Sequence, residues 1–178
     1  YANFEQRFGG AKIGDLKFID MLSATLTDQY TGNGMGMTAE KLAEQYSISR
    51  EEQDAFALLS HTRALAARDA GKFKEEIAPV TVKTRKGELV VDTDEHIKES
   101  GTMESLAKLR PAFKKDGTVT AANASGINDG AASVVVASEQ FVQDNGLKPI
   151  ARIVSWGVAG VDPTVMGIGP VPAIKQAL

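Results

Sequence analysis

Apolar and polar residues recur along the chain with two different periods, and these periods predict where helices and strands form. The longest helical pattern covers residues 50–70, where apolar positions recur three and four residues apart. Ser49 and Glu52 form a capping box at its start, and Gly71 suits the left-handed backbone that follows a helix end. Shorter helices are expected over residues 15–26, 39–46, 103–108, 138–146 and 172–178.

Alternation of apolar and polar residues predicts strands in two parts of the chain. Residues 76–83 and 88–92 alternate on either side of a turn, so they are expected to form a β-hairpin. The β-branched runs at 133–137 and 151–156 predict buried strands. Because a short helix is expected between these two runs, the second part of the chain has the pattern of an α/β core.

Glycine-rich segments mark the expected breaks between these elements. Residues 30–37 carry so many glycines that a helix there would be costly, so this segment is expected to be irregular. Thr38 is then expected to cap the next helix. Residues 157–169 are also glycine-rich and expected to be irregular.

A stretch of small residues at 120–132 is the most unusual feature of the sequence. Alanine, serine and glycine dominate it, so another surface can approach its backbone closely. Asn123, Asn128 and Asp129 can hold turns by hydrogen-bonding to the backbone nearby. The residues alone leave two interpretations equally open. The stretch is either a place where a ligand lies against the backbone or a tight loop packed beneath another element.

Composition is typical of an ordinary globular protein and excludes several kinds of partner and site. The hydrophobic fraction of 43% supplies a core, and the formal net charge of −3 does not suggest a nucleic-acid binder. No apolar run approaches the roughly 18 residues of a membrane span. The absence of cysteine excludes disulfides, a cysteine-ligated metal and a cysteine nucleophile within these residues. A chain of 178 residues is long enough for one domain or for parts of two.

The side chains that could carry catalysis lack suitable partners. Ser100, Ser105 and Ser125 have no identifiable base, and no paired carboxylates, phosphate loop or metal motif is found. His61 and His96 lack metal-ligand spacing and are expected to be surface or half-buried residues. Judged from its residues alone, the chain suits holding a ligand better than reacting with one.

Three basic residues, Lys83, Arg85 and Lys86, gather at the tip of the expected hairpin. They could contact an anion. A solvated hairpin tip is the favoured interpretation, because charge clusters on turns are usually exposed to water.

Several motifs together resemble the thiolases, and most of all the biosynthetic type, acetyl-CoA acetyltransferase. They lie at residues 35–40, 49–54, 71–77, 109–113 and 116–132. Their order and spacing resemble the family over nearly the whole chain. The chain opens on Tyr1 and stops as a helix begins, so we expect a central fragment of a longer thiolase.

The resemblance implies an α/β, thiolase-like fold in three parts. Residues 1–128 would form the loop domain, which contains helices and the β-hairpin, with a tetramerisation segment at residues 7–15. Residues 129–149 would end the N-terminal core domain, and residues 150–178 would start the C-terminal core domain. The intact protein is therefore expected to be a homotetramer.

The resemblance also implies a coenzyme A surface. Ser125 would hydrogen-bond to the pantetheine arm, Ala121 and Ile127 would flank it, and Lys98 and Ser105 would lie at the nucleotide end. Lys98 stands where some members have arginine, so it keeps the positive charge but lacks the planar guanidinium group that can stack or bind bidentately. Gly34 stands where some members have histidine. An apolar wall would be formed by Leu26, Met35, Ala112 and Phe113.

The family's reaction is a Claisen-type acyl transfer between acetyl-CoA molecules, which forms acetoacetyl-CoA, and its reverse, thiolysis. The resemblance implies that the family's catalytic cysteines and histidine lie outside these residues, so no catalytic residue is assigned and the chain alone is expected to be inactive. Two alternatives stay open: a degradative 3-ketoacyl-CoA thiolase, and a non-catalytic module that binds coenzyme A or serves assembly.

The expected ligands are coenzyme A thioesters, which act as substrates. We expect no cofactor, no metal, and neither nucleic acid nor membrane as a partner. The expected location is cytoplasmic, with mitochondria or peroxisomes as the alternatives in a eukaryote.

Overall fold

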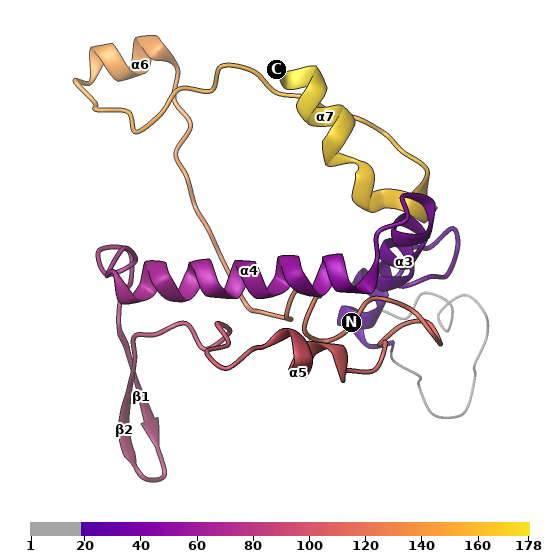
Figure 1. The fold of residues 1–178 in the computed structure, drawn as a ribbon. Helices are drawn as coiled ribbons and strands as arrows, with labels where there is room; N and C mark the ends of the chain where they lie inside the picture. The colour runs from indigo at the N-terminus through magenta and orange to yellow at the C-terminus, as the bar shows by residue number, and fades with distance from the viewer. Residues whose placement is uncertain (1–18) are drawn as a thin grey trace, which may run out of the picture.

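The computed structural model describes residues 19–178, and helix α4 (Arg50–Asp69) is its longest element. Figure 1 shows α4 as a long rod, with helix α3 (Met35–Gln45) near its start and a β-hairpin beyond its end. Helix α5 (Met103–Ala107) packs on α4. The other elements are α2 (Met21–Thr25), α6 (Glu139–Asp144), the 3-10 helix η1 (Pro163–Ile168) and α7 (Pro170–Ala177).

Local signals in the sequence set the ends of α4 as predicted. The Ser49 hydroxyl accepts a hydrogen bond from the Glu52 N–H at 3.1 Å, and the Glu52 carboxylate accepts one from the Ser49 N–H at 2.8 Å. This reciprocal pair is the expected capping box. Gly71 follows the helix with a φ of +70°, a left-handed conformation that glycine adopts without strain. The short helices α5 and α6 are also capped at their starts, by the side chains of Thr102 and Ser138.

Helix α3 corrects the prediction that residues 30–37 are irregular. The helix begins at Met35, not at residue 39, and it includes Gly36. Thr38 is not its cap, because its hydroxyl donates to the Met35 carbonyl at 2.7 Å within the first turn. A Cβ on Gly36 would lie only 2.3–2.4 Å from atoms of the Phe113 ring. Packing against this ring offsets the intrinsic cost of glycine in the helix, which is about 1 kcal/mol.

The predicted hairpin is confirmed. Strands β1 (Val80–Thr84) and β2 (Gly87–Val91) pair antiparallel, with Val80 opposite Val91 and Thr84 opposite Gly87. The first strand begins at Val80, four residues later than predicted. Figure 1 shows the hairpin projecting from the rest of the chain. Its residues are exposed on both faces, including the predicted basic tip.

The two buried strands predicted at 133–137 and 151–156 are not formed. Among residues 19–178, the β1–β2 pair is the only sheet, so neither segment has a neighbouring strand for its backbone groups. Both segments run as extended chain, with Val135 93% exposed and Val154 80% exposed. A β-branched run favours a strand, but it cannot make one without a partner.

The C-terminal segment folds back on itself. The Ser155 hydroxyl donates to the Ala177 carbonyl at 2.6 Å, and the Val158 N–H donates to the Gln176 side chain at 2.9 Å. Helix α7 starts at Pro170, two residues earlier than predicted. Helix η1 falls within the glycine-rich segment that was expected to be irregular, and it packs on α3 and α7.

Two predictions reach into residues outside the described range. The tetramerisation segment at 7–15 lies wholly outside it, and the helix predicted over 15–26 lies partly outside. Within the described part, α2 covers five residues of that helix, Met21–Thr25. In that same part, no helix combines the length and apolar character needed to cross a membrane.

The buried centre of the described chain is small and largely polar. It lies where α3, α4, α5 and residues 118–120 meet. Its apolar members are Ala43, Leu106 and Val119, and its polar members are Thr38, Glu40, Asp54 and Thr120. Because Glu40, Asp54 and Thr120 hydrogen-bond to residues 118–123, this centre fixes the chain where the small-residue stretch begins.

Candidate functional site

Glu40 holds the start of the small-residue stretch from α3. Its carboxylate is 4% exposed and accepts hydrogen bonds from the N–H groups of Val119 at 2.8 Å and Thr118 at 2.9 Å. The Thr118 hydroxyl donates to the same carboxylate at 3.0 Å. Burial would raise the pKa of Glu40, but these hydrogen bonds and the nearby Lys114 lower it overall. The carboxylate therefore stays ionised and binds two successive backbone amides.

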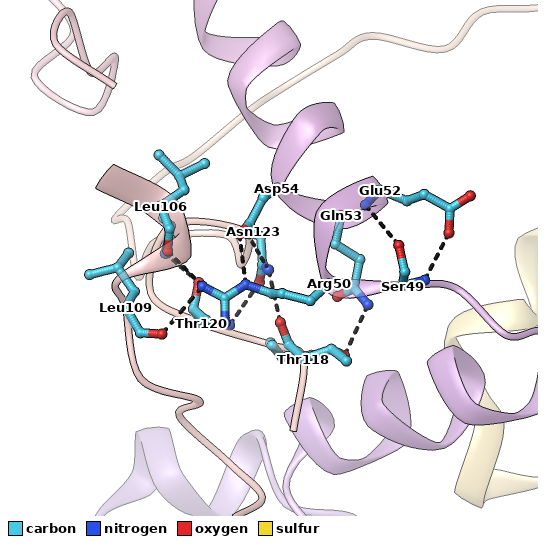
Figure 2. A network of polar contacts seen from close by, with 12 residues as sticks. Ser49, Arg50, Glu52, Gln53, Asp54, Leu106, Leu109, Thr118, Thr120 and Asn123 are labelled. Atoms are coloured by element: carbon cyan, nitrogen blue, oxygen red, sulfur yellow. Dashed lines mark hydrogen bonds and ion pairs between the residues drawn. The ribbon is translucent and has the colours of Figure 1, made fainter. Parts of the chain in front are cut away.

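Asp54 holds the same stretch from α4, as Figure 2 shows. It is 1% exposed, and its carboxylate accepts hydrogen bonds from the Asn123 side chain at 2.9 Å and from the Arg50 Nε at 2.7 Å. Arg50 also donates to the carbonyls of Leu106 at 2.6 Å and Leu109 at 3.3 Å. One buried ion pair therefore joins α4, the end of α5 and the small-residue stretch (Figure 2).

Hydrogen bonds inside the stretch complete the arrangement. The Asn123 side chain accepts from the Thr120 N–H at 2.7 Å and donates to the Thr118 carbonyl at 2.9 Å. The hydroxyl of the fully buried Thr120 accepts from the Ala122 N–H at 3.2 Å. Gln53 adds a contact from α4 to the Thr118 hydroxyl at 2.9 Å. We call residues 118–123 the clamped loop, because its backbone is fixed at both ends.

The predicted pantetheine-binding residues lie on or directly after the clamped loop. Ala121 is exposed within the loop, and Ser125 and Ile127 are exposed just beyond it. Ile127 is 76% exposed. Within the stretch, the tight-packing interpretation therefore fits Thr120, whereas the side chains of Ser125 and Ile127 are exposed.

The residues of the predicted apolar wall gather at the start of α3. The Met35 N–H donates to the Leu26 carbonyl at 3.0 Å, so these two residues are neighbours. The Phe113 ring lies against Gly36, and Ala112 precedes it in the chain. Leu26, Met35 and Phe113 are 37%, 44% and 49% exposed. The structure thus brings Phe113 to Leu26 and Met35, from a distant part of the sequence, in one partly exposed apolar region.

Lys98 and Ser105, predicted at the nucleotide end, lie on a different part of the chain. The Lys98 N–H donates to the His61 Nδ1 of α4 at 3.2 Å, and its side chain is exposed. The Ser105 hydroxyl accepts from the Thr102 N–H at 3.0 Å and donates to the Thr102 carbonyl at 2.8 Å. Ser105 therefore serves the capping of α5 in this structure.

Four residues that shape the site were not singled out as site residues from the sequence. Glu40, Arg50 and Asp54 were noted only as parts of the motifs at residues 35–40 and 49–54. Asn123 was expected to hold a turn, which it does. Glu40 and Asp54 reach partners 78 and 69 residues away, so local spacing could not reveal them.

The predicted site residues that are exposed include a hydroxyl, Ser125, and apolar side chains. The clamped loop is followed closely by the exposed Ser125, and a partly exposed apolar region lies at the start of α3. Within residues 19–178, no group of acidic, histidine or cysteine side chains is arranged to hold a metal ion.

Comparison with known proteins identifies the family. A family profile described as "Thiolase, N-terminal domain" matches residues 1–140. The acetyl-CoA acetyltransferase of Shinella zoogloeoides is 55% identical over 171 residues, covering 96% of this chain and 44% of that protein. The mitochondrial 3-ketoacyl-CoA thiolase of Mus musculus is 55% identical over 170 residues, covering 95% of this chain and 43% of that protein.

Solved structures agree with these relatives. The Bacillus anthracis acetyl-CoA acetyltransferase superimposes with a TM-score of 0.85 at 50% identity, covering 97% of this chain and 44% of that one. A human mitochondrial 3-ketoacyl-CoA thiolase in complex with CoA superimposes with a TM-score of 0.83 at 51% identity, covering 97% of this chain and 42% of that one. The chain belongs to the thiolase family, as its motifs predicted, and it spans less than half the length of these relatives.

Proposed function

We propose that this chain is the coenzyme A-binding central part of an acetyl-CoA acetyltransferase. The intact enzyme would condense two acetyl-CoA molecules to acetoacetyl-CoA and would catalyse the reverse thiolysis. The observation that carries the proposal is the clamped loop, which leaves Ser125 exposed in a chain 55% identical to an acetyl-CoA acetyltransferase. The CoA complex of a structural relative supports the choice of ligand.

The exposed groups match the chemistry of coenzyme A from one end to the other. The Ser125 hydroxyl can hydrogen-bond to an amide of the pantetheine arm, and Leu26, Met35 and Phe113 can cover its apolar portions. Lys98 can neutralise phosphate at the nucleotide end. Because buried carboxylates fix the clamped loop before any ligand arrives, binding loses little conformational entropy.

Coenzyme A binding is the direct test of this proposal. Calorimetry should detect binding of coenzyme A to the full-length protein that contains this chain, and Ser125→Leu should abolish or strongly weaken it because the added bulk lies where the ligand passes. Ser138→Leu is a matched control, since Ser138 caps α6 away from the proposed surface. Equal binding by the Ser125→Leu variant and the unmodified protein would refute the proposed surface.

We also propose that these residues alone are inactive. The chain contains no cysteine, so it cannot supply a thiolate to accept an acyl group. The 178-residue chain should therefore give no thiolysis of acetoacetyl-CoA in an assay where the full-length enzyme turns over. Measurable turnover by the chain alone would contradict this.

A degradative 3-ketoacyl-CoA thiolase is the second candidate, because a mouse enzyme of that name is also 55% identical. The ratio of kcat/KM values for acetoacetyl-CoA and for longer 3-ketoacyl-CoA thioesters would decide between the two. A preference for the longer substrates would favour the degradative enzyme. A chain that binds coenzyme A within a full-length protein without turnover would favour a non-catalytic module.

The proposal extends to the assembly and location of the intact protein. We expect a homotetramer in the cytoplasm, or in mitochondria or peroxisomes of a eukaryote. Sedimentation of the full-length protein should give the mass of four copies. No resident cofactor, metal, nucleic acid or membrane is part of the proposal.

A further inference from the structure

Two histidines lie between helix α4 and two separate parts of the proposed coenzyme A surface, Lys98 and the segment of Ser125 and Gly126. His61 lies on α4, His96 lies between the hairpin and α5, and their ring centroids are 6.1 Å apart with an interplanar angle of 39°. They are the only histidines in the chain. The proposed function assigns neither of them a role.

His61 holds the backbone of Lys98. Its Nδ1 accepts a hydrogen bond from the Lys98 N–H at 3.2 Å. A second contact fixes the same segment to α4, because Arg68 donates to the Glu99 carboxylate at 2.7 Å. Contacts with α4 therefore hold the backbone at Lys98, while the Lys98 side chain is exposed.

His96 connects this segment to the residue after Ser125. A Cβ on Gly126 would lie 2.5 Å from the His96 Cε1 and 2.9 Å from its Nδ1, so the ring packs directly on the glycine backbone. The His96 N–H donates to the Asp94 carboxylate at 2.8 Å, which holds the turn that carries the ring. Gly126 must lack a side chain for this contact to form.

We propose that His61 and His96 are positioning residues that set the place of Lys98 relative to Ser125 and Gly126. This inference rests on the proposed function. Lys98 would meet the phosphates of coenzyme A, whereas Ser125 would meet its pantetheine arm. The two histidines therefore fix the spacing between the sites for the two ends of one ligand. A ligand that lacks the nucleotide gains nothing from this spacing.

The test measures the affinity of the full-length protein for coenzyme A and for pantetheine, which has no nucleotide. His61→Ala should weaken coenzyme A binding by about fivefold, the usual effect of one hydrogen bond, and should leave pantetheine binding unchanged. His61→Asn should restore the affinity, because its Oδ1 can replace Nδ1 as the acceptor. His96→Ala should also weaken coenzyme A binding selectively, and His96→Phe should restore it through ring packing.

A double-mutant cycle shows whether His61 acts through Lys98. In a Lys98→Ala background, His61→Ala should cause no further loss of coenzyme A affinity. An equal loss in both backgrounds would overturn the inference, as would equal weakening of coenzyme A and pantetheine. Unchanged affinity in both His61 variants would overturn it as well. If the unmodified protein binds neither ligand, the proposed function fails and the inference falls with it.

Discussion

Replacing Asp54 by asparagine tests whether the buried ion pair fixes the clamped loop. The Asp54 side chain is 2% exposed, and its partner Arg50 is 18% exposed. Asparagine is nearly the same size, but it keeps only one acceptor for two donors, Arg50 Nε and Asn123 Nδ2. The substitution therefore leaves a buried donor facing another donor and leaves Arg50 without its counter-charge.

The expected loss of stability follows from this burial. Removing one partner of a buried ion pair costs about 3–5 kcal/mol, and the retained acceptor places Asp54→Asn near the lower end, about 3 kcal/mol. Glu104→Gln is the matched control, since it also changes a carboxylate to an amide in an i,i+4 pair. Glu104 and Lys108 are 82% and 72% exposed, so the control should cost about 0.5 kcal/mol or less.

Urea unfolding of the full-length protein measures both free energies of unfolding. Hydrogen exchange then locates the effect, because the amides of Thr120 and Ala122 should exchange faster in the Asp54→Asn variant and normally in the control. A loss no greater than that of Glu104→Gln would refute the argument. Unchanged exchange at Thr120 would show that the ion pair does not hold the loop.

Three further predictions follow from the same contacts. Hydrogen bonding lowers the pKa of Glu40 in the folded protein below the ordinary glutamate value of 4.5, so its contribution to stability is complete above that value and is lost as pH falls through the lower folded pKa. Glu40→Gln should remove this acid-dependent loss when the free energy of unfolding is measured as a function of pH. Gly36→Ala should destabilise by about 1–3 kcal/mol in thermal unfolding, because the new methyl group overlaps the Phe113 ring, and a neutral or stabilising effect would contradict this packing. Ser125→Ala should weaken coenzyme A binding by about 1 kcal/mol, as expected for one neutral hydrogen bond, and calorimetry showing unchanged affinity would refute the role of Ser125.

Features set by neighbouring residues could be predicted from the sequence. The Ser49 capping box depends only on residues three positions apart. The end of the helix depends only on the ability of Gly71 to adopt a positive φ. Both ends of α4 were therefore predicted. The hairpin was foreseen because its strands are adjacent in the chain. The predicted start of α3 was wrong, because the contact that favours helix at Gly36 comes from Phe113, 77 residues later in the sequence.

The strand predictions failed for a related reason. The runs at 133–137 and 151–156 have the composition of strands, but a strand requires a second segment to pair with. The same limit applied to the site. Small residues and Ser125 could be recognised along the chain, whereas the carboxylates of Glu40 and Asp54 gained their role only when folding brought distant residues to them.

The exposed valines at 134–136 have a consequence for handling these residues in isolation. Val134, Val135 and Val136 are 84%, 93% and 74% exposed, and residues 130–138 carry no charge. An extended, uncharged, β-branched segment with free backbone groups favours pairing between copies and the growth of cross-β aggregates. The charges of Asp129 and Glu139 flank this segment and oppose such stacking from both sides. The same valines that indicate a buried strand thus make the isolated chain prone to aggregate as its concentration rises.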